Sequence, residues 1–123
     1  MSNLEFSSLK LKIETRTVGK DQVVLLIFDG QITNTNAYEI NEKVNEIFQN
    51  NIYNLILDLT YLQYINSIGV STLLSMIKIV EQHQGRMYIG GLNPFLDNVL
   101  KLMDIPKQIK IFPTSDLAIA NWK

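Results

Sequence analysis

The chain has 123 residues, of which 46% are hydrophobic and 19% are charged, a composition typical of a globular protein and unlike that of a disordered one. This length fits a single domain, residues 1–123, with one hydrophobic core. A formal net charge of −1 provides no positive field that would gather nucleic acid, so we expect no nucleic-acid partner. Cysteine is absent and His83 is the one histidine, which excludes a cysteine nucleophile or a disulfide and leaves little for a metal site or a catalytic triad.

The hydropathy pattern contains no membrane-spanning segment. No stretch reaches the roughly 18 apolar residues of a transmembrane helix. The first ten residues also lack the basic and then apolar layout of a secretory signal. We therefore expect a cytoplasmic protein with no membrane insertion.

Two strands are predicted near the beginning of the chain. Apolar and charged residues alternate over residues 9–14, which indicates a strand with one face in solvent, and we place it at the edge of the sheet. A turn at Gly19-Lys20-Asp21 precedes the unbroken apolar run of residues 23–28, which is typical of a strand buried on both faces. We expect the two strands to pair as a hairpin.

Two amphipathic helices are predicted in the middle of the chain, on either side of a strand at residues 55–59. In residues 37–48 apolar side chains recur at intervals of three and four, and Thr35 or Asn36 is the expected N-cap. The second helix begins near Ser67 and is apolar around much of its circumference, so it should be the most deeply packed helix. Gly85 is the expected stop signal.

The last third of the chain continues the alternation of strands and helices. Residues 86–91 predict a short strand, and Asn93-Pro94 begins a helix whose buried stripe includes Phe95. A final strand at residues 109–112 is followed by a helix at residues 115–122. The order predicts a single α/β domain with a mixed, mostly parallel β-sheet, an N-terminal hairpin and about four helices.

Two polar loops are the candidate site. Residues 30–36 follow one buried strand and residues 60–67 follow the next, and each loop leads into a helix, so both should lie at the same edge of the sheet. Ser67 stands at a helix start, where free N–H groups and the helix dipole favour an anion such as a phosphoryl group. Capping alone also selects serine at such a position, so the spacing leaves both roles open.

Two sequence motifs in these loops resemble those of a known family. The stretch "LILDLTYLQYINSIGVSTLL" is similar to the signature of the STAS domain of anti-sigma factor antagonists, and "DGQITNTNAYEI" resembles the earlier loop of that family. The resemblance extends from Leu9 to about Trp122.

The resemblance implies a bacterial regulatory protein in signalling and transcription regulation. Such an antagonist binds an anti-sigma factor that is also a serine kinase, and thereby releases a sigma factor. Phosphorylation at the position of Ser67 ends the binding, and a serine phosphatase restores it. The implied partner surface consists of Gly30, Gln31, Thr33, Asn34, Asn36, Asn66, Ile68, Gly69, Ser71 and Thr72. Kinase and ATP belong to the partner, so we expect no catalytic residue, no metal and no cofactor in this chain.

Three residues depart from the family pattern. Thr33 and Asn66 stand where aspartates are usual, so two negative charges are missing, although both side chains keep their hydrogen-bonding capacity. Ile68 replaces a small residue and adds apolar surface beside the serine. We therefore expect recognition of a cationic partner to differ.

Two other functions remain open. One is an unphosphorylated accessory or scaffold subunit of a transport or signalling assembly, which the loss of the aspartates favours. The other is a small-ligand site in the crevice between the two loops. Asp29 and Asp58 lack a neighbouring nucleophile or metal ligands, and we interpret them as anchors of loop hydrogen bonds.

Overall fold

The computed structural model describes residues 2–122, which form one six-stranded sheet and four helices. The strands are β1 (Ser2–Phe6), β2 (Leu9–Val18), β3 (Asp21–Ile32), β4 (Asn54–Ile65), β5 (Arg86–Gly90) and β6 (Lys110–Phe112). The helices are α1 (Ala37–Gln49), α2 (Ser67–Gln82), α3 (Pro94–Leu102) and α4 (Ser115–Ala120). The strands lie in chain order, with β1, β2 and β3 antiparallel and β3 to β6 parallel, which confirms the predicted mixed α/β architecture.

Strand β1 is absent from the sequence prediction. It pairs with β2 along its whole length, so β2 is an interior strand and not the edge strand that the alternation suggested. The side chains of Leu4 and Phe6 pack against the core. Two apolar positions are too few to establish a period of two, which is why the pattern did not reveal this strand.

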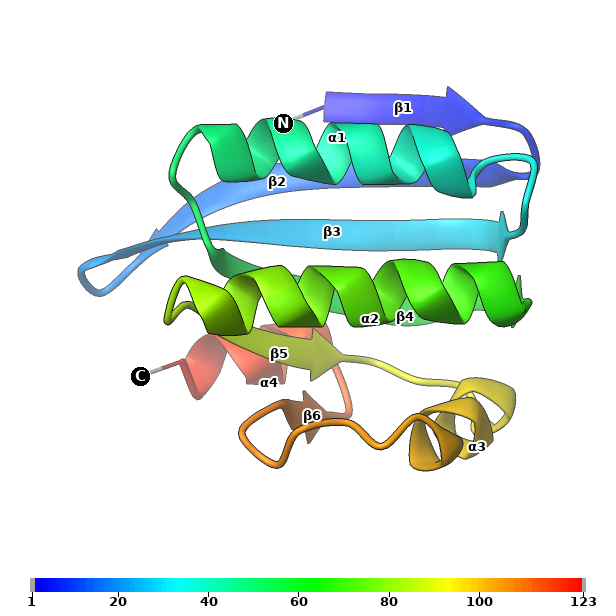
Figure 1. Cartoon of the computed structure of the whole chain (residues 1–123). Helices are drawn as coiled ribbons and strands as arrows, with labels where there is room; N and C mark the ends of the chain where they lie inside the picture. Colours follow the sequence, from blue (N-terminus) through cyan, green and yellow to red (C-terminus); the bar gives the residue numbers. More distant parts are fainter. Residues whose placement is uncertain (1, 123) are drawn as a thin grey trace.

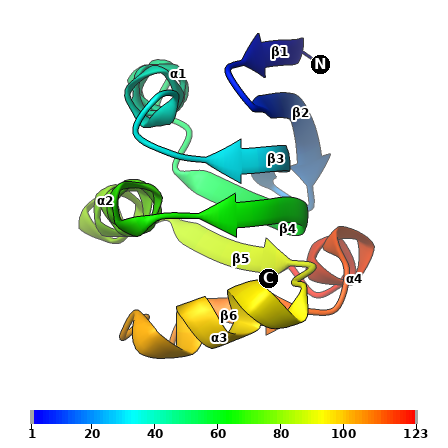
Figure 2. The same cartoon turned by 90° about the vertical axis from the view of Figure 1, so that its right-hand side faces the viewer.

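The sheet has a different cover on each face. Helices α1 and α2 lie side by side on one face, and α4 lies on the other (Figures 1 and 2). The larger core cluster fills the space under α1, α2 and α3, and includes Phe28, Ile40 and Met76. The smaller cluster joins α4 and Trp122 to β3, β4 and β5. Both sides of the central strands are therefore buried where helices cover them.

Two details of the helices differ from the sequence prediction. Phe95 was expected in the buried stripe of α3, but its side chain is 44% exposed, while Leu96 and Leu100 are buried. Helix α2 ends at Gln82, and the left-handed residue after it is Gln84, at φ 57°, and not Gly85. No helix within residues 2–122 is long and apolar enough to cross a membrane.

The carboxyl edge of the parallel strands gathers the starts of the helices. In Figure 1 the right-hand end of the sheet carries the end of β3 leading into α1 and the end of β4 leading into α2. Ile32 and Ile65, the last residues of the two strands, are partners in the β3–β4 register. The two loops of the candidate site are therefore neighbours, as the parallel topology predicts.

Candidate functional site

Ser67 is the first residue of α2, and its side chain is exposed. The preceding residue, Asn66, caps the helix, because its side-chain Oδ1 accepts a hydrogen bond from the Gly69 amide at 3.0 Å. No hydrogen bond within residues 2–122 engages the Ser67 hydroxyl. The amides of Ser67 and Ile68 lie at the start of the helix, where the helix provides no carbonyl partner and the dipole is positive. The hydroxyl is thus free and accessible, in a setting that favours an anion.

The β3–α1 loop lies directly against the start of α2. The Asn66 amide donates a hydrogen bond to the Ile32 carbonyl at 3.3 Å. Gly69 is buried, and a Cβ at this position would lie 2.4 Å from Ile65 Cγ1 and 2.9 Å from Ile32 Cγ2. The first turn of α2 therefore rests on the ends of β3 and β4. A single partner can touch both loops.

The buried side chain of Asn36 stabilises the β3–α1 loop through hydrogen bonds. Its side chain is fully buried, and its Nδ2 donates to the carbonyls of Ser7 at 2.6 Å and Gln31 at 2.8 Å. Its Oδ1 accepts from the Thr33 amide at 3.0 Å. Asn36 is the residue before α1, but its side chain makes no capping bond to the helix. Asn36 is therefore the N-cap residue, one of the two predicted, but its side chain ties the loop to the β1–β2 turn and makes no capping bond.

Burial divides the residues expected to contact a partner. The side chains of Asn36 and Thr72 are buried, and so is Gly69, so these three residues offer a partner much less surface than the sequence analysis expected. Thr72 donates its hydroxyl to the Ile68 carbonyl at 3.0 Å. The exposed residues are Gln31, Asn34, Ile68 and Ser71, with Gly30, Thr33 and Asn66 partly exposed.

Exposed aromatic side chains surround the two loops, and the sequence analysis did not identify them. Tyr38 and Phe95 are the second residues of α1 and α3, and they are 73% and 44% exposed. Tyr64, near the end of β4, is 45% exposed and stacks on Phe95 with ring centroids 6.2 Å apart. Ile68 adds a further exposed apolar side chain, at 46%. Aromatic side chains are enriched at protein interfaces. Of these three aromatic residues, Tyr38 could have been recognised as exposed from the sequence, because it lies off the apolar stripe of α1.

A shallow groove of about 290 Å³ lies between the first turns of α1 and α2. Asn34, Tyr38, Ile68 and Ser75 are among the residues that line it. Neither residues 30–38 nor residues 59–77 contain a charged side chain, so these two segments are neutral. Among residues 2–122, no group of three or more His, Cys, Asp or Glu side chains could hold a metal ion.

Solved structures with the same fold include anti-sigma factor antagonists. The unphosphorylated form of the antagonist SpoIIAA matches with a TM-score of 0.70 and 21% identity, over 89% of this chain and 94% of that one. The phosphorylated form of SpoIIAA from Bacillus matches with a TM-score of 0.71 and 19% identity, over 91% and 100%. An anti-sigma factor antagonist from Mycobacterium paratuberculosis matches with a TM-score of 0.70 and 18% identity, over 92% of each chain. At these identities the structures establish a shared fold.

The sequence itself carries the family assignment. The two loops of the site and the strands and helices that hold them lie within residues 14–118, and this segment matches the sequence model of the STAS domain. It includes Ser67, Asn66 and the whole β3–α1 loop. The chain therefore belongs to the STAS domain family.

Proposed function

We propose that this protein is an anti-sigma factor antagonist that is switched by phosphorylation at Ser67. In the unphosphorylated state it binds an anti-sigma factor that is also a serine kinase, and a sigma factor is released. Phosphorylation of Ser67 ends this complex, and a serine phosphatase restores it. The observation that carries the proposal is the free, exposed Ser67 hydroxyl at the start of α2, beside the β3–α1 loop.

The surroundings of Ser67 explain why a phosphate would act as a switch. The neighbouring exposed side chains, among them Ile68, Gln31 and Asn34, are neutral. A phosphoryl group adds about −1.5 to −2 charges at neutral pH. A partner that covers apolar Ile68 and Tyr38 would have to bury this charge, and an unpaired buried charge is strongly unfavourable. The same group is stable when the surface is free, because the amides at the start of α2 and the solvent can accommodate it.

The chain itself acts by binding in this proposal. The partner supplies ATP and the catalytic groups for phosphoryl transfer, and the Ser67 oxygen is the acceptor. The absence of aspartate at positions 33 and 66 makes the contact surface less acidic. We therefore expect the partner's matching surface to be more apolar and less basic than that of a partner that binds an acidic antagonist.

The test uses the purified protein and an anti-sigma factor kinase from the same genome. Incubation with the kinase and ATP should place phosphate on Ser67, as mapped by mass spectrometry. The Ser67→Ala variant should remain unmodified, while Ser7→Ala, a change at an exposed serine of the β1–β2 turn that is not among the expected contact residues, should be modified normally.

Binding measurements complete the test. Ser67→Asp should weaken the complex with the kinase by at least about tenfold, or about 1.4 kcal/mol, and Ser67→Ala should leave it unchanged. Phosphate on another residue, or a complex that tolerates Ser67→Asp, would contradict the switch. A stable complex with a transport or signalling assembly that is insensitive to phosphate would instead support the role of an accessory subunit.

A further inference from the structure

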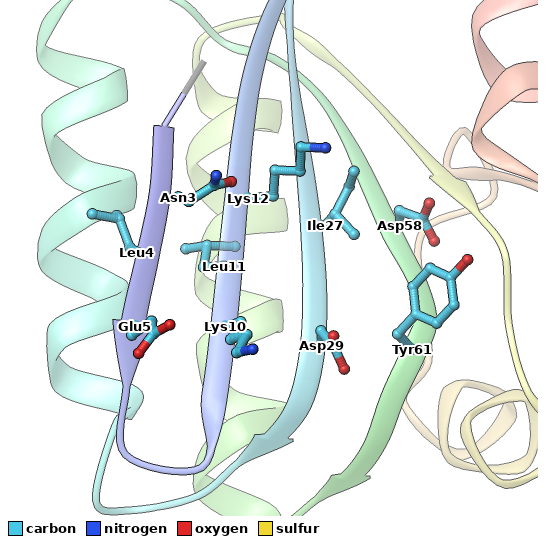
Figure 3. Close-up of a pocket in the computed structure, with 10 residues that line it drawn as sticks. All are labelled: Asn3, Leu4, Glu5, Lys10, Leu11, Lys12, Ile27, Asp29, Asp58 and Tyr61. Carbon is cyan, nitrogen blue, oxygen red and sulfur yellow. The ribbon is translucent and has the colours of Figure 1, made fainter.

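The sheet face opposite α1 and α2 is only partly covered. Helix α4 packs against β4, β5 and β6, and leaves open the side of β1, β2 and the later parts of β3 and β4 (Figure 2). A hollow of about 580 Å³ lies on this open face, well away from the groove between α1 and α2 (Figure 3). Its volume is within the roughly 300–1,000 Å³ of small-molecule sites.

The strand register places a cation and a carboxylate at opposite ends of one row of side chains in the hollow. One row across the sheet consists of Lys12 on β2, Ile27 on β3 and Asp58 on β4, each paired in register with the next. The row therefore runs from a cation through an apolar side chain to a carboxylate. Two strand spacings separate Lys12 from Asp58, roughly 10 Å between their backbones.

Asp58 is a buried carboxylate in the hollow, and one of its oxygens is fixed by a hydrogen bond. It is only 7% exposed, and its Oδ1 accepts a hydrogen bond from the Thr60 amide at 3.0 Å. Its Oδ2 has no hydrogen-bond partner within residues 2–122. No unpartnered side-chain oxygen in that range is completely buried, so Oδ2 keeps some exposure, and Asp58 is one of the residues that line the hollow. A carboxylate this deeply buried gains from a cationic hydrogen-bond donor, because the desolvation of its charge is then compensated.

The lysines on β2 supply positive charge at the other side. Lys10 is exposed, belongs to none of the ion pairs found in residues 2–122, and lies in register between Glu5 and Asp29. Lys12 pairs with Glu14 at 3.5 Å, which holds it on β2 and leaves Asp58 without a cationic partner. The phenol of Tyr61 lines the hollow on the side of Asp58.

We propose that this hollow binds a small molecule with an ammonium group at one end and a carboxylate at the other. The ammonium group donates to Asp58 Oδ2, a short chain of methylene groups lies over Ile27, and the carboxylate lies against Lys12, since the carboxylates of Glu5 and Asp29 flank Lys10. This order of groups is complementary to the row on the sheet. The site is independent of Ser67, which lies at the edge of the sheet and does not line the hollow.

The experiment uses 6-aminohexanoate as probe and follows the backbone amides by NMR. Shifts should be confined to residues 10–12, 27–29 and 58–61. Hexylamine and hexanoate, which each carry one of the two charges, should bind at least about tenfold more weakly. Ser67→Asp should bind the probe like the unmodified protein.

Two variants make the test specific. Asp58→Asn keeps an oxygen that can accept from the Thr60 amide but removes the charge, and should weaken probe binding at least about tenfold. Asp116→Asn, a change at an exposed carboxylate of α4, should have no effect. If Asp58→Asn does not fold, Lys12→Gln provides the same comparison from the opposite end of the row. Absence of localised shifts, equal binding of hexylamine, or binding that the tested variant does not weaken would overturn the proposal.

Discussion

At the scale of single residues, two asparagines define the site in different ways. Asn66 is half-buried and points its Oδ1 at the Gly69 amide, so it fixes the direction in which α2 leaves the sheet. Asn36 is buried and bonds to three backbone groups of the loop and of the β1–β2 turn. The same residue type therefore serves as a helix cap in one loop and as an internal brace in the other.

Asn66→Ala should lower the free energy of unfolding by about 1 kcal/mol, because the Gly69 amide loses its acceptor. Asn66→Asp should keep the stability, because a carboxylate caps as well and interacts favourably with the helix dipole. Urea denaturation followed by circular dichroism measures both. Ser71→Ala, in the same helix, should change the stability by less than about 0.5 kcal/mol. A loss as large for Asn66→Asp as for Asn66→Ala would show that capping is not the cause.

At the scale of elements, the β1–β2 turn supports the β3–α1 loop. The Gln31 amide donates to the Ser8 carbonyl at 2.8 Å, and Asn36 reaches the Ser7 carbonyl. Gly30 allows this contact, because it has φ +131° and a Cβ there would lie 2.3 Å from the Ser8 carbonyl oxygen. The N-terminal strand thus contributes to the position of a loop that follows it in the chain by more than twenty residues.

Gly30→Ala should therefore lower the free energy of unfolding by at least about 2 kcal/mol, through the clash with Ser8 and the unfavourable backbone angle. Gly19→Ala is the matched control: Gly19 also has a positive φ, of +62°, but nothing lies within 4 Å of an added Cβ. We expect a cost of only about 1 kcal/mol there. Thermal and urea unfolding of the two variants compare the effects directly. Equal losses would mean that the close approach to Ser8 contributes nothing.

At the scale of the whole molecule, Trp122 connects the segment after α4 to β3 and β5. Its side chain is 9% exposed and packs in the smaller core cluster with Val23, Tyr88 and Ala118. Its Nε1 donates to Asp21 Oδ2 at 2.9 Å, across 101 residues of sequence. The Arg86 guanidinium lies 5.5 Å from the centre of the indole ring. This residue therefore holds α4 on the second face of the sheet.

Trp122→Ala should lower the free energy of unfolding by about 3 kcal/mol, because a large aromatic side chain leaves a cavity and Asp21 loses its donor. Leu117→Ala, in α4 itself, should have little effect, less than about 1 kcal/mol, since Leu117 is 44% exposed. Chemical denaturation provides both values. If the two variants are equally stable, α4 does not depend on the tryptophan.

Most elements and their order, the meeting of the two loops and the place of Ser67 could be predicted from local sequence patterns. These features follow from local patterns: the period of apolar residues, the asparagine before each of α2 and α3, and the rule that parallel strands end at one edge. Strand β1 was missed because Leu4 and Phe6 alone do not make a period.

The accessibility of the polar residues and the open faces of the sheet depend on the packing of the whole chain. The burial of Asn36 depends on Ser7, and that of Trp122 on Val23 and Tyr88, which are distant in sequence. The hollow beside Asp58 exists because α4 covers only one part of the sheet. Contacts of this kind join residues that are distant in sequence, so no local pattern encodes them, and burial follows from the final packing alone.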